Sequence, residues 1–340
     1  MEPVRFGVIS TAKIGIQKVI PAMQQSARCR VLAIASRDLT RARAAADALG
    51  IPRAYGSYAE LLQDPEIEAV YNPLPNHLHV PISIEAAAAG KHVLCEKPIA
   101  LTAAEAQKLV EARDHAGVVI QEAFMVRCHP QWLRARALVR EGRIGQLRVV
   151  QGSFSYMNTD PANVRNQAGI GGGGLYDIGC YPIVTARFLF GAEPVRVASQ
   201  IEYDPNFETD RLASVLLQFP KGQALFCCST QLVPYQRMQI LGTKGRIEIE
   251  IPFNAPPDRP CRIFVDDGSK LGDASASLET FDVVNQYTVQ GDLFARAIRE
   301  GTPLPFPLED AVKNMRVLDA IFRAGRSGRW EEVQPTGGAG

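Results

Sequence analysis

The sequence predicts an α/β protein of two domains: a doubly wound parallel sheet, then an α+β domain with an open, mainly antiparallel sheet. Three observations lead to this prediction. The chain has 340 residues, more than one hydrophobic core usually organises, so two domains are expected. Up to residue 122, short apolar runs alternate with helix-like segments, as in parallel strands covered by helices. Beyond residue 122, polar and apolar residues alternate, as in antiparallel strands with one solvated face.

The first domain, 1–122, contains runs rich in Val, Ile and Leu that we predict to be strands. They cover 4–10, 30–36, 69–75, 92–98 and 118–124. Helices are predicted at 14–25, 40–50, 80–90 and 102–117. The last three end on Gly50, Gly90 and Gly117, and glycine readily takes the left-handed conformation at a helix C-terminus.

The second domain, 123–330, is predicted to begin with a helix from Pro130 and to continue mainly in strands. Strand-like segments cover 147–156, 195–203, 212–220, 222–231, 237–245 and 246–251. A glycine run, Gly171–Gly174, precedes a helix predicted over 175–190. Two late helices, near 286–299 and 308–325, could pack back on the first domain, and 331–340 is expected to be a flexible tail.

Composition narrows the possible partners. Lys and Arg number 37 against 36 Asp and Glu, so there is no electrostatic argument for a nucleic acid or a membrane surface. The first residues lack the basic end and apolar run of a signal peptide, and no apolar run reaches membrane-spanning length. The seven cysteines and five histidines show no metal-ligand spacing. We therefore expect a cytoplasmic protein with reduced thiols and no metal site.

The first predicted strand enters its helix through Ser10–Gly15, the place of a dinucleotide fingerprint. That fingerprint, G-x-G-x-x-G, allows a tight turn and a close approach of pyrophosphate to the backbone. Here Ser10 and Ala12 replace the first two glycines, and the loop is completed by Thr11, Lys13, Ile14 and Gly15. The helix N-terminus still offers N–H groups to an anion. By itself the loop is also compatible with an ordinary strand–helix turn.

The end of the second strand favours NADP over NAD. An NAD site places a carboxylate there to bind the ribose 2′-hydroxyl, whereas this chain has Ser36 and Arg37, with Arg41 four residues on. A hydroxyl and guanidinium groups bind a 2′-phosphate that a carboxylate would repel. The alternative is that both arginines are merely solvated.

Two motifs together resemble a known family. Glu96–Lys97–Pro98 follows a predicted strand, and Asp177-x-Gly179-x-Tyr181 stands near mid-chain. The chain resembles the family of glucose–fructose oxidoreductase, inositol dehydrogenase and the rhizopine-catabolism protein over 4–330. Within it, the chain is most similar to the branch with sugar dehydrogenases and dimeric dihydrodiol dehydrogenase. The resemblance implies a Rossmann domain, a polyol or sugar substrate, and a homodimer or homotetramer.

The resemblance also implies further cofactor contacts. Glu96 and Lys97 would lie beside the nicotinamide ribose and ring. The nicotinamide side would be covered by Leu74, Pro75, Asn76 and His79. Arg165 and Tyr287 fall where relatives touch the cofactor from the second domain.

Lys97, Asp177 and Tyr181 are the candidate catalytic residues. Asp177 and Tyr181 stand four apart in a predicted helix and would share a face, and the preceding glycine run would let the backbone approach a ligand. The usual tyrosine pKa, about 10, is too high for efficient base catalysis, and a nearby ammonium lowers it. Lys97 would polarise the substrate oxygen, Tyr181 would transfer its proton, and Asp177 would accept hydrogen bonds from neighbouring hydroxyls. Alternatively, Lys97 pairs with Glu96, and the other two are core or helix-surface residues.

The leading hypothesis is an NADP-dependent oxidoreductase acting on a sugar or sugar derivative. Alternatives are a glucose–fructose-type transhydrogenase that retains NADP, and a trans-dihydrodiol dehydrogenase. A non-enzymatic alternative is a dinucleotide-binding sensor, against which the joint presence of Lys97, Asp177 and Tyr181 argues. Arg127 and His129 are not assigned to the catalytic set.

Overall fold

The computed structural model describes residues 2–333, which form two compact units. The first unit comprises residues 2–125 together with Asn285–Val312, and the second comprises Val126–Val284 together with 313–333. The late helix α8 therefore belongs with the first unit. The flexible tail was predicted for 331–340, and residues 334–340 of it lie outside the described residues.

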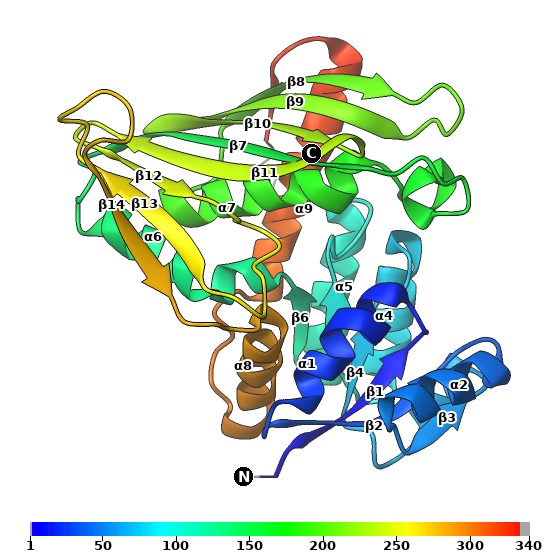
Figure 1. Cartoon of the computed structure of the whole chain (residues 1–340). Coiled ribbons are helices and arrows are strands. Elements are labelled where there is room, and N and C mark those ends of the chain that lie inside the picture. Colours follow the sequence, from blue (N-terminus) through cyan, green and yellow to red (C-terminus); the bar gives the residue numbers. More distant parts are fainter. Residues whose placement is uncertain (1, 334–340) are drawn as a thin grey trace. The chain divides into compact units, whose positions relative to one another are not determined.

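The first unit is built on a parallel sheet (Figure 1). Within the described residues it has six strands in the order β3-β2-β1-β4-β5-β6, all paired in parallel. The strands are β1 (Val4–Ile9), β2 (Cys29–Ala35), β3 (Arg53–Tyr55), β4 (Ala69–Asn72), β5 (His92–Glu96) and β6 (Ile120–Ala123). The helices are α1 (Ile20–Gln24), α2 (Leu39–Leu49), α3 (Tyr58–Gln63), α4 (His79–Ala88), α5 (Ala103–Ala116), α8 (Gln286–Glu300) and the start of α9 (Leu308–Ser327). The doubly wound fold predicted for this part is confirmed.

Burial explains why the apolar runs form central strands. Every residue of β4 is buried, as expected where helices cover both faces of a parallel sheet. Helix α8 joins this core from far along the chain, because the Phe294 ring packs 6.0 Å from that of Phe6. Helix α2 begins where the Asp38 side chain accepts hydrogen bonds from the N–H groups of Thr40 and Arg41 and ends on Gly50, which is left-handed.

The helix predicted at 14–25 is not a regular α-helix. It begins with a π-helical turn, Gly15–Val19, in which the Ile20 N–H donates to the Gly15 carbonyl five residues back. The cause is Pro21, which lacks an N–H and cannot continue the usual pattern. The short helix α1 begins at Ile20, one residue before this proline.

The second unit is built on a mixed, mainly antiparallel sheet (Figure 1). Within the described residues the order is β14-β13-β12-β11-β7-β10-β9-β8-β15, and only β7 and β10 pair in parallel. The strands are β7 (Leu147–Met157), β8 (Arg196–Tyr203), β9 (Asp210–Phe219), β10 (Gly222–Ser229), β11 (Gln231–Gly242), β12 (Arg246–Ile249), β13 (Cys261–Asp266), β14 (Ala276–Phe281) and β15 (Glu331–Glu332). Helices α6 (Pro130–Arg140) and α7 (Cys180–Phe190) lie on one face, which confirms the predicted fold class.

The period-two pattern places one face of each strand in the core. In β9, Ala213, Val215 and Leu217 are buried, while Ser214 between the first two is exposed and Leu216 between the last two is half-buried. The late helix α9 also packs against this sheet, since the Ser199 hydroxyl donates to the Ile321 carbonyl at 2.7 Å.

Three details of the second unit differ from the prediction. Strands β13 and β14 were not predicted, because turn-forming residues surround them. Glu331 and Glu332, assigned to the tail, pair with β8 as β15. The helix predicted over 175–190 is a π-helical turn, Leu175–Gly179, followed by α7. In this turn the Cys180 N–H donates to the Leu175 carbonyl five residues back. Pro182 again explains the turn, because proline lacks the N–H that would continue the usual pattern.

No helix within residues 2–333 has the length and apolar character needed to cross a membrane.

Candidate active site

The turn that carries Lys97 is held by side chains from two neighbouring strands. The Tyr71 hydroxyl of β4 donates to Glu96 Oε1 at 2.6 Å, and the Lys97 N–H donates to Glu96 Oε2 at 3.3 Å. On the other side, the Ile99 N–H donates to Glu122 Oε1 of β6 at 2.9 Å. The peptide bond between Lys97 and Pro98 is cis. Burial, and then the Glu96 carboxylate, raise the pKa of Tyr71 well above its usual value, so it stays a hydrogen-bond donor.

His79 supports the backbone around this turn, which differs from the cofactor contact predicted for it. Its side chain is 1% exposed, and its ring nitrogens lie 2.7 Å from the carbonyl oxygens of Leu74 and Pro98. Burial lowers the pKa of His79 to about 4, so it is neutral at pH 7. One ring nitrogen of the neutral imidazole donates to one of these carbonyls, and the ring packs between the loop containing Pro75 and Asn76 and the residue after Lys97.

The predicted phosphate loop has an unusual backbone at its first residue. Ser10 has φ of 89°, a left-handed conformation that favours glycine. Its Oγ accepts a hydrogen bond from the Ala12 N–H at 3.3 Å. Ser10 therefore adopts a φ that a glycine at this first fingerprint position would adopt without strain. Thr11 and Ile14 are half-buried, and Lys13 is exposed.

The residues predicted to select NADP lie where β2 ends and α2 begins. Ser36 is buried, and its Oγ accepts from the Asp38 N–H at 3.3 Å. Burial raises the pKa of Tyr58, and a hydrogen bond from the exposed Arg37 guanidinium partly offsets this. Arg41 is exposed and lies 3.8 Å from Asp38. The Asp38 carboxylate caps α2 and lies beside Arg41. Ser36, Arg37 and Arg41 are hydroxyl and guanidinium groups of the kind that bind a phosphate.

Tyr287 lies in the first unit, whereas the resemblance placed it in the second domain. It is the second residue of α8 and packs against the core that contains Phe6 and Phe294. Burial, and then Glu96, raise its pKa. The sequence order misled the prediction, because the chain returns to the first unit at Asn285.

Asp177 forms the centre of a polar cluster in the second unit. Its Oδ2 accepts from the Tyr156 hydroxyl at 2.6 Å and lies 2.7 Å from Arg165 Nε. The Asp177 side chain is 13% exposed and that of Arg165 is 41% exposed. Asp177 raises the pKa of Arg165, and burial followed by Asp177 raises the pKa of Tyr156. The cluster thus fixes one carboxylate at the edge of the core.

Tyr181 lies in the first turn of α7 and is 5% exposed. Its ring packs edge-on to that of Phe154 at 5.6 Å and lies 5.3 Å from that of Phe253. Trp132 extends this aromatic cluster, with its ring stacked on Phe253 at 6.4 Å. The packing holds the Tyr181 ring in one orientation. Lys97 belongs to the first unit and Tyr181 to the second, so their proximity stays a prediction.

The glycine run before α7 is occupied by protein and not by open space, contrary to the expected approach to a ligand. A Cβ at Gly172 would overlap the Arg165 carbonyl, and a Cβ at Gly173 would overlap Asp210 Oδ1. Asp210 and Tyr156 were both missed in the sequence. Neither stands in a motif, and only the fold brings them to this segment.

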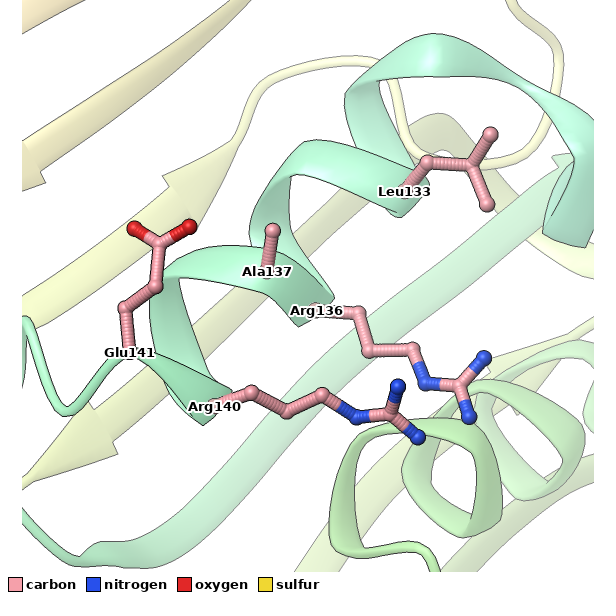
Figure 2. A pocket seen from close by; sticks show the side chains of 5 residues that line it. All are labelled: Leu133, Arg136, Ala137, Arg140 and Glu141. Carbon is pink, nitrogen blue, oxygen red and sulfur yellow. The ribbon is translucent and has the colours of Figure 1, made fainter.

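A surface hollow of about 410 Å³ lies elsewhere in the second unit, along one face of α6. Figure 2 shows its lining residues, Leu133, Arg136, Ala137, Arg140 and Glu141. None of them is a predicted site residue. The Arg136 guanidinium lies 4.3 Å above the Phe188 ring of α7.

Comparison with known families identifies the chain. Residues 4–124 match the model of the oxidoreductase family with an NAD-binding Rossmann fold, and residues 132–248 match the GFO/IDH/MocA C-terminal domain. The chain belongs to the Gfo/Idh/MocA family of oxidoreductases. The family predicted from the two motifs is confirmed.

Full-length relatives of this Gfo/Idh/MocA oxidoreductase are similar throughout. An uncharacterized oxidoreductase of Rhizobium meliloti is 52% identical over 98% of this chain and 100% of its own length. D-xylose 1-dehydrogenase (NADP(+)) 2 of Haloferax volcanii is 38% identical over 96% of this chain and 99% of its own. The crystal structure of aldose-aldose oxidoreductase from Caulobacter crescentus with glycerol has a TM-score of 0.88 and 26% identity, covering 97% and 99% of the two chains.

Proposed function

We propose that this Gfo/Idh/MocA oxidoreductase uses NADP to transfer a hydride between nicotinamide and a carbinol or carbonyl carbon of a sugar or sugar derivative. The observation that carries the proposal is the setting of Asp177. Its carboxylate is held by Arg165 and Tyr156 at the edge of the core, four residues before Tyr181. A fixed, partly exposed carboxylate is suited to accept hydrogen bonds from the neighbouring hydroxyls of a polyol. The name of the Haloferax relative, a D-xylose dehydrogenase, supports the same substrate class.

The proton is assigned to Tyr181 and Lys97. In the oxidation direction, Tyr181 takes the proton of the substrate hydroxyl, and the Lys97 ammonium stabilises the negative charge that develops on this oxygen. Bound NADP supplies the hydride acceptor. An ammonium close to a phenol favours the phenolate, so Lys97 also makes Tyr181 a better base. The aromatic packing of Tyr181 against Phe154 and Phe253 keeps its hydroxyl in place during this transfer.

The chain's own residues are assigned to the cofactor as follows. Ser36, Arg37 and Arg41 bind the 2′-phosphate, and the backbone of the loop after Ser10 lies against the pyrophosphate. Asn76 and Glu96 position the nicotinamide and its ribose. His79 acts on both through the backbone carbonyls that it contacts.

Steady-state kinetics with D-xylose and other aldoses, using NADP or NAD, test the proposal through the ultraviolet absorbance of the reduced cofactor. We expect turnover with an aldose and a higher kcat/KM with NADP than with NAD. Replacing Arg37 with Ala removes one charge-assisted hydrogen bond to the phosphate, which lowers kcat/KM with NADP about tenfold or more and leaves that with NAD nearly unchanged. Arg43→Ala is the matched control, since Arg43 is an exposed arginine of α2, the helix that follows Arg37.

Other outcomes would contradict parts of the proposal. Equal kcat/KM values for NAD and NADP in the wild type contradict the role of Ser36 and Arg37 and leave the catalytic residues in place. If only one equivalent of cofactor per protein chain is reduced, and addition of a second sugar reoxidises it, the protein is a transhydrogenase that retains NADP. The likeness to the aldose-aldose oxidoreductase favours this alternative. Turnover of a trans-dihydrodiol in place of any aldose overturns the substrate class. NADP binding without turnover of any of these compounds favours the sensor.

A further inference from the structure

Asp210 is a buried carboxylate that the proposed reaction does not use. It is the first residue of β9 and is 2% exposed. Its Oδ2 accepts a hydrogen bond from the Leu175 N–H at 2.6 Å, and the Gly174 N–H also donates to the carboxylate. Within residues 2–333 it has no arginine or lysine partner: the adjacent Arg211 pairs with Glu202 and Asp204. A buried carboxylate bound by backbone N–H groups alone requires an explanation.

The glycine run is shaped around this carboxylate. Gly173 has φ of 113°, a conformation that other residues rarely adopt, and a Cβ there would overlap Asp210 Oδ1. A Cβ at Gly174 would lie 3.3 Å from Oδ2. Since the Asp210 carboxylate fills the space that a side chain would take, the glycines and Asp210 form one structural unit.

That unit is connected directly to the polar cluster around Asp177. The Gly173 N–H donates to the Arg165 carbonyl at 2.8 Å, and the Asp177 N–H donates to the Gly173 carbonyl at 3.2 Å. Both partners of the Arg165–Asp177 ion pair are therefore tied to the residue that packs on Asp210. The same segment leads within a few residues to Tyr181.

We propose that Asp210 is a positioning residue of the candidate active site, whose carboxylate anchors the start of the Leu175–Phe190 helical segment and thereby fixes Asp177 and Tyr181. The inference rests on the proposed function for the roles of Asp177 and Tyr181. The anchor itself rests on the hydrogen bonds and on the glycine packing.

The surroundings of Asp210 make the anchor sensitive to pH. Four ionisable side chains interact electrostatically with Asp210: Asp177, Tyr156 of β7, Tyr203 of β8 and Cys228 of β10. Burial raises the pKa of Asp210 to about 7, the backbone N–H groups oppose this shift, and Asp177 adds to it. Because the pKa of Asp210 in the fold lies above its ordinary value of 3.8, the folded segment holds this proton more tightly than an opened one does. The anchor therefore weakens as pH rises from about 4 to about 7.

Amide hydrogen exchange of the full chain, followed by mass spectrometry over peptides covering 172–180, tests the anchor without relying on activity. We expect Asp210→Ala to raise exchange in this segment about tenfold, because amides lose a buried acceptor. Asp210→Asn keeps the shape and removes the charge. In the wild type, protection of this segment should fall as pH increases from about 4 to about 7, and in Asp210→Asn it should not. Asp204→Asn is the matched control: Asp204 is a buried carboxylate that accepts from the Asn206 and Phe207 N–H groups.

Kinetics of the same variants with D-xylose and NADP distinguish positioning from simple structural support. We expect kcat to fall about tenfold or more in Asp210→Ala while KM for NADP changes little, since Ser36 and Arg37 are untouched. Unchanged protection in both Asp210 variants would overturn the anchor. Faster exchange with unchanged kcat would overturn the positioning role.

Two further results have a defined meaning. If Asp210→Ala does not fold, the pH dependence of protection in the wild type and in Asp210→Asn decides the question alone. A wild-type chain without turnover of any aldose refutes the proposed function, and the exchange measurement still decides the anchor.

Discussion

Replacing Tyr181 with Phe separates the catalytic role of this residue from its place in the core. The substitution removes the hydroxyl and keeps the ring, which is 5% exposed and packs against Phe154 and Phe253. If the Tyr181 hydroxyl transfers the substrate proton, its loss should abolish most of the turnover. If it is only the end of a buried ring, its loss should leave turnover nearly unchanged. The two readings can therefore be compared in a single variant.

The expected magnitudes differ enough to decide. Loss of one hydrogen-bonding hydroxyl changes the free energy of unfolding by about 1 kcal/mol. Loss of a general acid–base group lowers turnover about 10²- to 10⁴-fold, which corresponds to roughly 3 to 5 kcal/mol of transition-state stabilisation. Tyr181→Ala, in contrast, removes the ring and costs about 3 to 5 kcal/mol of stability. We thus expect Tyr181→Phe to be folded, nearly as stable as the wild type, and almost inactive.

The assay pairs urea denaturation with aldose oxidation at saturating NADP. Phe253→Leu serves as the packing control, since it disturbs the same aromatic cluster without removing a polar group. It should lose stability and, because the Phe253 ring also positions Tyr181, lower kcat to some extent but far less than Tyr181→Phe does. If Tyr181→Phe retains more than about a tenth of the wild-type kcat, the assignment of Tyr181 as proton-transfer residue is wrong.

Three further predictions concern the first unit. Lys97→Met should lower kcat about 100-fold or more while NADP binding, measured by calorimetry, persists; retained turnover would contradict the role of Lys97. Ser10→Gly should not lower the urea midpoint, because the φ of 89° no longer costs energy, whereas Ser10→Val should cost about 2 kcal/mol; equal midpoints would contradict the strained turn. The pKa of His79, lowered to about 4 by burial, means that the unfolded chain binds more protons between pH 4 and the ordinary value of 6.5. The stability contributed by neutral His79 is therefore present above pH 6.5 and lost as pH falls towards 4, by about 3 kcal/mol in total. His79→Gln should flatten this part of the pH–stability curve, and an unchanged slope would count against a buried neutral imidazole.

Local patterns were sufficient for the fold class and for most elements. Continuous apolar runs indicated central parallel strands, and β4 is buried along its whole length. Alternation indicated the one-sided sheet, and β9 alternates as predicted. Glycines placed the ends of α2 and α5, where Gly50 and Gly117 are left-handed. These features depend on a few neighbouring residues, and the sequence records them directly.

The prediction was less accurate where a single residue alters the hydrogen-bond pattern of a helix. Pro21 and Pro182 were read as parts of ordinary helices. The structure places a π-helical turn before each, because a residue without an N–H forces its neighbours to find other partners.

By itself, the sequence determined the α/β fold class and the family, and it supplied the residues proposed for catalysis: Lys97, Asp177 and Tyr181. Only the tertiary structure decided which partners those residues have. It brought Tyr156 and Arg165 to Asp177, placed Asp210 against the glycine run, and returned Tyr287 to the first unit. Such contacts join residues far apart in the chain. Burial and packing of the whole fold select them, and no local pattern of hydrophobicity or spacing encodes them.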